Sequence, residues 1–148
     1  MLAAHLVLRV LQRYWRFTRG LTLAAAACVV DSEGKVLLVK SAGPGWTLPG
    51  GTVREGETLW DTLERTLKVD CGIAIGPGAT LCWIYPEADR SGVQQTGLFL
   101  ITRWEQALPL PPESVAYFSR DRLPAAISAE TAARIGHALE GRTAAEVC

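Results

Sequence analysis

The sequence has no excess of either charge and no long run of like charges. Lysine and arginine together number 15, and aspartate and glutamate together also number 15, among 148 residues. A chain with this balance has no overall field that would attract nucleic acid or an acidic partner. Motifs that contact bases, and repeats that interleave aromatic and basic residues, are lacking as well. We therefore expect no nucleic-acid partner.

Closely spaced cysteine pairs are also missing. The four cysteines are scattered at Cys28, Cys71, Cys82 and Cys148, whereas zinc sites and thiol–disulfide motifs bring two cysteines within a few residues of each other. We expect reduced thiols, with Cys28 and Cys82 buried as small apolar residues. Reduced thiols are typical of intracellular proteins, so the expected location is the cytoplasm.

No apolar run approaches the 18 or so residues that a membrane-spanning helix needs. The first residues nevertheless have a clear pattern, because Arg9, Arg13 and Arg16 occur among apolar residues without any acid. At helical spacing these arginines share one side with His5 and Gln12, and the other side is apolar. The apolar side consists of Val7, Val10, Leu11 and Tyr14.

This pattern predicts an amphipathic helix over residues 1–20. The arginines follow the apolar part, which is the reverse of their order in a secretory signal. One interpretation is that the helix packs its apolar side on the domain or on a second subunit, forming a homodimer. The other is that the helix lies on a membrane surface with its arginines toward anionic lipid, which would make the protein membrane-peripheral.

The remainder of the chain is long enough for one domain with its own core. Leu21–Val30 is rich in alanine and valine and predicts a buried strand. Asp31–Gly34 has the composition of a turn, and Lys35–Lys40 is expected to be the hairpin partner of the first strand. Two more strands are expected at Thr80–Tyr85 and Thr96–Thr102, joined by a polar loop over residues 86–95.

Near the C-terminus, the proline-rich residues 107–112 are expected to be an irregular connection. Val115–Phe118 predicts a short strand. Ser128 is expected to cap a last helix that buries Ile135 and Leu139. Residues 141–148 are expected to be a frayed tail.

A helix is also predicted in the middle of the chain, after Thr58. Thr58 followed by Asp61 forms a capping box, and Gly72 has the position of a C-terminal helix cap. Three leucines at a spacing of four residues form an apolar stripe that is expected to face the sheet. They are Leu59, Leu63 and Leu67.

The glycines and charged residues around this helix resemble the Nudix box, the signature of hydrolases that cut nucleoside diphosphates linked to another group. The positions that match are Gly51, Glu57, Arg65, Leu67, Gly72 and Ile73. The resemblance implies an α/β fold, the Nudix-type α/β/α sandwich with a mixed sheet, over residues 21–140. The helix predicted over residues 1–20 would precede this domain.

Three acidic positions of the box bear the metal chemistry, and here they are Thr66, Val69 and Asp70. Residues three and four apart project from one face of a helix, where three carboxylates would bind Mg²⁺ or Mn²⁺. Only Asp70 is still a carboxylate. The frame of the box is therefore present, and most of its anionic donors are replaced.

The resemblance assigns roles to particular residues. It implies Glu57, Arg65 and Asp70 as catalytic residues. The metal ligands would be the Gly50 carbonyl, Glu57 and Asp70. Glu57 and Arg65 also have an architectural interpretation, in which a bidentate ion pair orients the box.

Trp46 and Gly51 are the predicted substrate-binding residues, because an aromatic ring stacks on a nucleobase and a glycine-rich loop binds phosphate. For Trp46, ordinary packing is the alternative. The partner implied is a nucleotide-derived small molecule.

Two functions follow from the incomplete box. The first is a Nudix-type pyrophosphohydrolase that uses Mg²⁺ or Mn²⁺ and is weak or specialised. The second is a catalytically inactive Nudix domain that binds a nucleotide or another protein.

Overall fold

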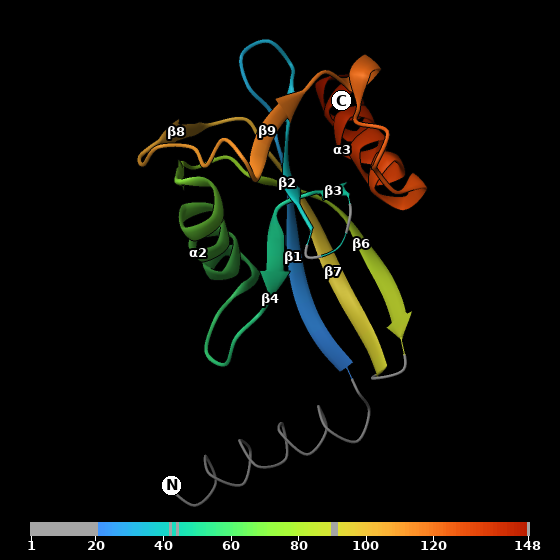
Figure 1. The fold of residues 1–148 in the computed structure, drawn as a ribbon. Helices are drawn as coiled ribbons and strands as arrows, with labels where there is room; N and C mark the ends of the chain where they lie inside the picture. Colours follow the sequence, from blue (N-terminus) through green and yellow to red (C-terminus); the bar gives the residue numbers. More distant parts are fainter. Residues whose placement is uncertain (1–20, 42, 44, 90–91, 148) are drawn as a thin grey trace, which may run out of the picture.

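The computed structural model describes residues 21–41, 43, 45–89 and 92–147, so the helix predicted over residues 1–20 lies outside the described residues. A four-stranded sheet forms the centre of the domain (Figure 1). In it, β1 (Leu21–Val29) runs parallel to β7 (Gly92–Ile101) and antiparallel to β4 (Gly50–Thr52). The outer strand β6 (Thr80–Asp89) is antiparallel to β7, so the sheet is mixed.

Two smaller sheets surround this centre. One has the order β3-β2-β9, and the other pairs β5 with β8. Their strands are β2 (Val36–Lys40), β3 (Trp46–Thr47), β5 (Ile73–Ile75), β8 (Trp104–Gln106) and β9 (Val115–Phe118). A single 3-10 turn, Arg120–Arg122, follows β9.

The predicted central helix is present as α2 (Leu59–Cys71). Its capping box is complete, because the Thr58 hydroxyl accepts the Asp61 amide and the Asp61 carboxylate accepts the Thr58 amide. Gly72 ends the helix in the left-handed conformation at φ 69°, which glycine adopts without steric cost. The start and the end of α2 are therefore fixed by local sequence.

The last helix, α3 (Ala129–Val147), begins as predicted, because the Ser128 hydroxyl accepts the Thr131 amide at 3.0 Å. Ile135 is 1% exposed, as expected for its buried side. The prediction of a frayed tail after Gly141 is wrong, since the helix continues to Val147.

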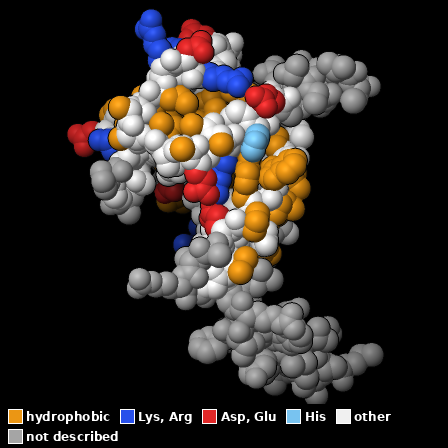
Figure 2. All heavy atoms as spheres, turned by 90° about the vertical axis from the view of Figure 1, so that its right-hand side faces the viewer, with side chains coloured by type: hydrophobic (Ala, Val, Ile, Leu, Met, Phe, Trp, Pro, Cys, Tyr) orange, Lys and Arg blue, Asp and Glu red, His pale blue; other side chains and the backbone are white. Residues whose placement is uncertain are grey.

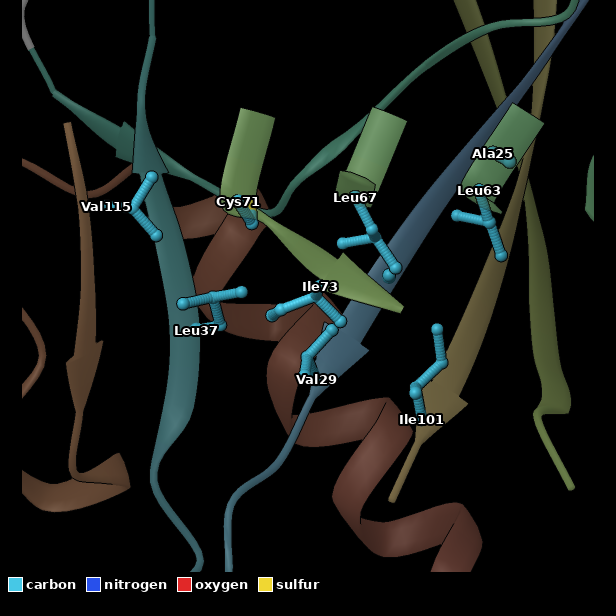
Figure 3. Packing of buried hydrophobic residues seen from close by; sticks show 10 residues of the cluster. Ala25, Val29, Leu37, Leu63, Leu67, Cys71, Ile73, Ile101 and Val115 are labelled. Carbon is cyan, nitrogen blue, oxygen red and sulfur yellow. The ribbon is translucent and has the colours of Figure 1, made fainter. Parts of the chain in front are cut away.

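Helices α2 and α3 lie on opposite faces of the central sheet, which gives the predicted α/β/α arrangement (Figure 1). Alternate residues of β1 point to alternate faces. One core cluster joins β1 to α2 through Ala25, Val29, Leu63, Leu67 and Cys71 (Figure 3). The other core cluster joins β1 to α3 through Ala26, Cys28, Val30, Ile135 and Ala138.

The cysteines fit this core in two ways. Cys28 and Cys71 are fully buried, and burial raises the pKa of each thiol to about 12. Cys82 is only half-buried, so the expectation of burial is confirmed for Cys28 and only partly for Cys82.

The predicted hairpin between residues 21–30 and 35–40 is wrong. The turn forms, with the Asp31 amide donating to the Lys35 carbonyl at 3.0 Å, but only the single bridge Val30–Val36 follows it. Strand β2 then pairs with β3 and β9 instead. Both edges of β1 are already occupied, by β4 and β7, so no edge remains for β2.

The predicted polar loop over residues 86–95 is also wrong, because β6 and β7 extend through it as a long antiparallel ladder. Pro86 lies within β6 and pairs with Gln95. Proline is tolerated there because β6 is an edge strand, where a missing N–H need not break a ladder.

Within the part of the chain that the structure describes, no helix is both long enough and apolar enough to span a membrane.

Candidate functional site

The loop between β4 and α2 contains the first half of the predicted box. It is closed at its base by two bonds, from the Glu57 amide to the Arg54 carbonyl at 3.0 Å and from the Arg54 amide to Glu57 Oε1 at 2.9 Å. Gly56 lies at φ 83°, a conformation that favours glycine. The loop is thus a tight turn held by the Glu57 side chain itself.

Glu57 also binds Arg65, two helical turns into α2. Arg65 Nε donates to Glu57 Oε2 at 2.7 Å and Arg65 Nη2 to Glu57 Oε1 at 2.9 Å, which is a bidentate pair. Arg65 Nη2 donates further to the Thr52 carbonyl at 3.2 Å, and the Thr62 hydroxyl donates to Glu57 Oε1 at 3.2 Å. The network therefore connects the loop, the helix and β4.

These donors favour the ionised form of Glu57. The hydrogen bonds from Arg65 contribute most, followed by the Arg54 amide, and together they lower the pKa of Glu57 from 4.5 to about 2. Four hydrogen bonds to one carboxylate are what the architectural interpretation requires. The geometry supports that role for Glu57 and Arg65, while their catalytic role stays a prediction.

Thr66, at the first of the three positions where the box is expected to have acids, lies beside Gly51 of β4. Its side chain is buried, with the residue 6% exposed, and its hydroxyl donates to the Thr62 carbonyl at 2.8 Å. A β-carbon placed on Gly51 would come within 3.0 Å of Thr66 Cγ2. Thr66 therefore presents a methyl group to Gly51 and uses its hydroxyl inside the helix.

Gly50 is required by a still closer approach. A β-carbon there would overlap the Ala25 carbonyl oxygen of the neighbouring strand. Gly50 thus lies against the backbone of β1, and Gly51 lies against the Thr66 side chain of α2.

Val69 and Asp70 are at the exposed end of α2. Val69 is 76% exposed, and Asp70 is exposed on the last turn. A carboxylate near a helix C-terminus gains nothing from the helix dipole. Asp70 is therefore a solvated acid beside an apolar surface residue.

The predicted ligands lie at different places around α2. Glu57 precedes the N-cap and its carboxylate is engaged by Arg65, while Asp70 lies on the last turn of the helix. Across the described ranges, no group of three or more Asp, Glu, His or Cys side chains could hold a metal. The metal-ligand assignments to Gly50, Glu57 and Asp70 stay untested predictions.

Trp46, the predicted stacking residue, lies on the other side of the domain core from α2. Its ring packs edge-on against Phe118 at 5.0 Å between centroids, and its amide donates to the Ala126 carbonyl at 2.8 Å. It also lines an open pocket of about 460 Å³ together with Thr47, Ile127 and Thr131. Trp46 therefore both packs against Phe118 and lines a pocket. Substrate binding by Trp46 and Gly51 stays a prediction.

A polar cluster on the α3 face was not predicted from the sequence. Arg134 of α3 contacts Glu87 of β6 and, at 3.0 Å, Glu130, and its guanidinium lies 4.7 Å from the centre of the Tyr85 ring. Gln94 of β7 donates to Glu87 at 3.2 Å. Glu87 is therefore engaged both by Arg134 of α3 and by Gln94 of β7.

The same cluster includes His137, for which the sequence indicates no partner. Its Nδ1 is 2.6 Å from the Tyr85 hydroxyl, and the two rings stack at 5.9 Å. Local sequence contains no signal for these contacts, because they join residues 47 to 52 positions apart.

Comparisons with known proteins agree with this architecture. The crystal structure of a MutT NUDIX hydrolase from Burkholderia pseudomallei matches with a TM-score of 0.67 and 23% identity, covering 79% of this chain and 97% of that one. The solution structure of the E. coli ORF135 protein also matches with a TM-score of 0.67, at 17% identity, covering 84% and 92%. A search of curated protein sequences found no match.

At these identities the structural matches show the fold alone, and the family is shown by sequence. The model of the NUDIX domain family matches residues 20–138, which is most of the chain and includes the loop, α2 and the glycines described above. The chain therefore belongs to the Nudix family.

Proposed function

We propose that this Nudix-family protein binds compounds in which a nucleoside diphosphate is linked to another group, and that it hydrolyses them only slowly. The observation that carries the proposal is the state of Thr66. Its side chain is neutral and buried, its hydroxyl donates to the Thr62 carbonyl and its methyl group faces Gly51, so it supplies no negative charge to an ion. Asp70 is the one acidic position of the three that retains a carboxylate.

The electrostatic loss is large compared with a typical binding energy. One pair of unit charges about 4 Å apart is worth about 4 kcal/mol at an effective dielectric constant of 20, before desolvation. Replacing two carboxylates removes two such interactions with a divalent ion. Even if solvent reduces this lost interaction energy severalfold, Mg²⁺ or Mn²⁺ should bind only weakly. Asp70 and the Gly50 carbonyl are the donors closest to what the family requires.

A second candidate is a domain that binds a nucleotide or a protein without hydrolysis. The Glu57–Arg65 network favours it, because this network fixes the loop through hydrogen bonds between protein groups. A loop held in this way keeps its shape without an ion. Binding could then persist after the catalytic donors have been lost.

A hydrolysis assay separates the two candidates. Purified full-length protein is given a panel of nucleoside diphosphate derivatives with Mg²⁺ or Mn²⁺, beside the Thr66→Glu/Val69→Glu double variant. Slow hydrolysis predicts a low, metal-dependent rate that the double variant raises by about a hundredfold or more, equivalent to about 2.7 kcal/mol of transition-state stabilisation. A wild-type rate as high as that of the double variant would refute the proposal.

The Asp70→Asn variant tests whether any residual rate depends on the retained acid. It should remove the metal-dependent rate of the wild type, while Asp61→Asn, an acid on the first turn of α2, provides a control on the same helix. If the wild type shows no metal-dependent rate but calorimetry detects binding of a non-hydrolysable nucleoside diphosphate analogue, the second candidate is correct.

A further inference from the structure

One half of the central sheet face is left uncovered by α2. The register places Leu81 opposite Phe99 and Ile84 opposite Gly97, while Leu23 pairs with Gln95. These residues project to the face on which α2 packs, because Phe99 packs against the α2 core cluster. Val93 lies on this face as well, because the register of β7 is unbroken from Val93 to Ile101.

The uncovered part is apolar and exposed. Its members are Leu23 at 43%, Leu81 at 47%, Ile84 at 52% and Val93 at 37% exposure, and we refer to these four as the apolar platform. At its centre Gly97 has no side chain, and a β-carbon there would meet Leu59, Leu81 and Phe99 at 3.3–3.4 Å. The platform therefore lies directly beside the side chain of Leu59, the first residue of α2.

The exposure of these side chains is unusual for a single domain. Isolated apolar side chains on a surface are ordinary, but four on one face of three adjacent strands, grouped around Gln95 and Gly97, indicate a place where another surface binds. Hydrophobic side chains are visible on the side of the molecule that carries β6 and α3 (Figure 2), and the edge strand β6 supplies Leu81 and Ile84 of the platform.

We propose that the apolar side of residues 1–17 of the same chain covers this platform. The described chain begins at Leu21, two residues before Leu23, so the preceding segment enters the domain at the border of the platform. Its sequence has one apolar side, with Val7, Val10 and Leu11, and an opposite side with the three arginines. Packing this apolar side on the platform would leave the arginines in solvent.

The lengths agree with this arrangement. A helix of 17 residues is about 25 Å long. Along β7, the platform extends from Val93 to the level of Phe99, which is about 20 Å of strand. Residues 18–20, which end in Gly20, would let the chain reverse direction into β1.

The test measures the accessibility of a thiol placed on the platform. Full-length protein with Ile84→Cys, in a Cys82→Ala/Cys148→Ala background, is alkylated with iodoacetamide under native conditions. Buried Cys28 and Cys71, whose pKa is raised by burial, will not interfere. The comparison protein contains the further changes Val7→Asp and Val10→Asp, which break the apolar side of the segment without touching the domain.

We expect alkylation at position 84 to be about tenfold slower with the native segment than with the Asp variant, which corresponds to a docked population of roughly nine in ten. Ser32→Cys, in the exposed turn after β1, should react equally fast in both backgrounds. A general loss of folding would instead show as alkylation of Cys28 and Cys71, which are buried in the folded protein.

Three results would overturn the proposal. Equal rates at position 84 in both backgrounds would show that the segment does not cover the platform. Protection that grows with protein concentration would assign the platform to a second copy of the chain. Protection that appears only with vesicles containing anionic lipid would place the segment on a membrane.

Discussion

The Thr66 methyl group lies against Gly51, so closely that a β-carbon on the glycine would approach Thr66 Cγ2 to 3.0 Å. This contact joins the second glycine of β4 to α2. The hydroxyl of the same side chain donates to the Thr62 carbonyl, so Thr66 packs against the strand with one atom and bonds to its own helix with the other.

The contact predicts a steric effect at Gly51. Gly51→Ala should lower the free energy of unfolding by about 1–2 kcal/mol, because the added methyl group meets a buried side chain that is bonded to the helix. Thr66→Ser removes Cγ2 and should restore most of this loss when combined with Gly51→Ala. Urea denaturation of the four proteins in this cycle measures the coupling. Additive effects of the two changes would show that the methyl contact is not what limits Gly51.

Thr66 and Val69 should respond differently to substitution by glutamate. Val69→Glu should change stability by less than about 0.5 kcal/mol, because Val69 is 76% exposed. Thr66→Glu should destabilise by about 2–3 kcal/mol, because it places an ionisable group at a site that is 6% exposed.

A bound ion would reduce that cost. Millimolar Mn²⁺ should therefore raise the melting temperature of the Thr66→Glu/Val69→Glu variant and leave the wild type unchanged. Thermal unfolding with and without Mn²⁺ measures this, with Val69→Glu alone as the control. An equal rise in the wild type would show that its ion binding does not depend on these positions.

The lowered pKa of Glu57 predicts that the stability of the fold depends on pH in the acidic range. Its pKa is lowered from 4.5 to about 2 in the folded state, mainly by Arg65, so the unfolded chain takes up the proton more readily. The ionised carboxylate thus stabilises the fold above about pH 4.5, and this contribution is lost as the pH falls toward 2. Glu57→Gln should lack that part of the dependence.

Urea denaturation at a series of pH values between 2.5 and 6 checks this. The difference in stability between wild type and Glu57→Gln should shrink as the pH falls. Glu33→Gln, which changes an exposed acid paired with Lys35, should leave the pH profile close to that of the wild type. A difference that stays constant over the whole range would contradict the role of the Glu57 charge.

The cluster around Arg134 predicts unequal effects of its two carboxylates. The Arg134 side chain is 14% exposed, Glu87 is 33% exposed and Glu130 is 67% exposed. Glu87→Gln should cost about 1–2 kcal/mol, because it leaves a largely buried cation with one exposed partner. Glu130→Gln should cost only about 0.3–0.5 kcal/mol, the usual value for an exposed helical pair. Equal losses in chemical denaturation would show that burial of the pair does not matter.

Local sequence predicts those parts of the structure that depend on neighbours along the chain. Helix α2 is an example, since its capping box at Thr58 and its left-handed cap at Gly72 involve residues close in sequence. The frame of the Nudix box is equally local, because its glycines and charged residues occur at fixed spacing around α2. These features could be predicted because the helical repeat alone decides which of these residues share a face.

Strand pairing could not be predicted in the same way. The turn at Asp31 formed as expected, yet β2 joined another sheet because β4 and β7 already occupied β1. The polar composition near Pro86 indicated a loop, but an edge strand tolerates proline and polar side chains on both sides. Competition for strand edges is a property of the whole fold.

The sequence by itself determined the family frame of this protein and the residue types at the positions of its box, because both depend on residues at fixed spacing. Only the tertiary structure decided what those residues do. It engaged Glu57 with Arg65, turned the Thr66 hydroxyl back into the helix, paired Glu87 with Arg134 and left an apolar sheet face beside the entry of the chain. The physical reason is that spacing fixes direction along one element, whereas contacts between elements depend on how all of them pack together.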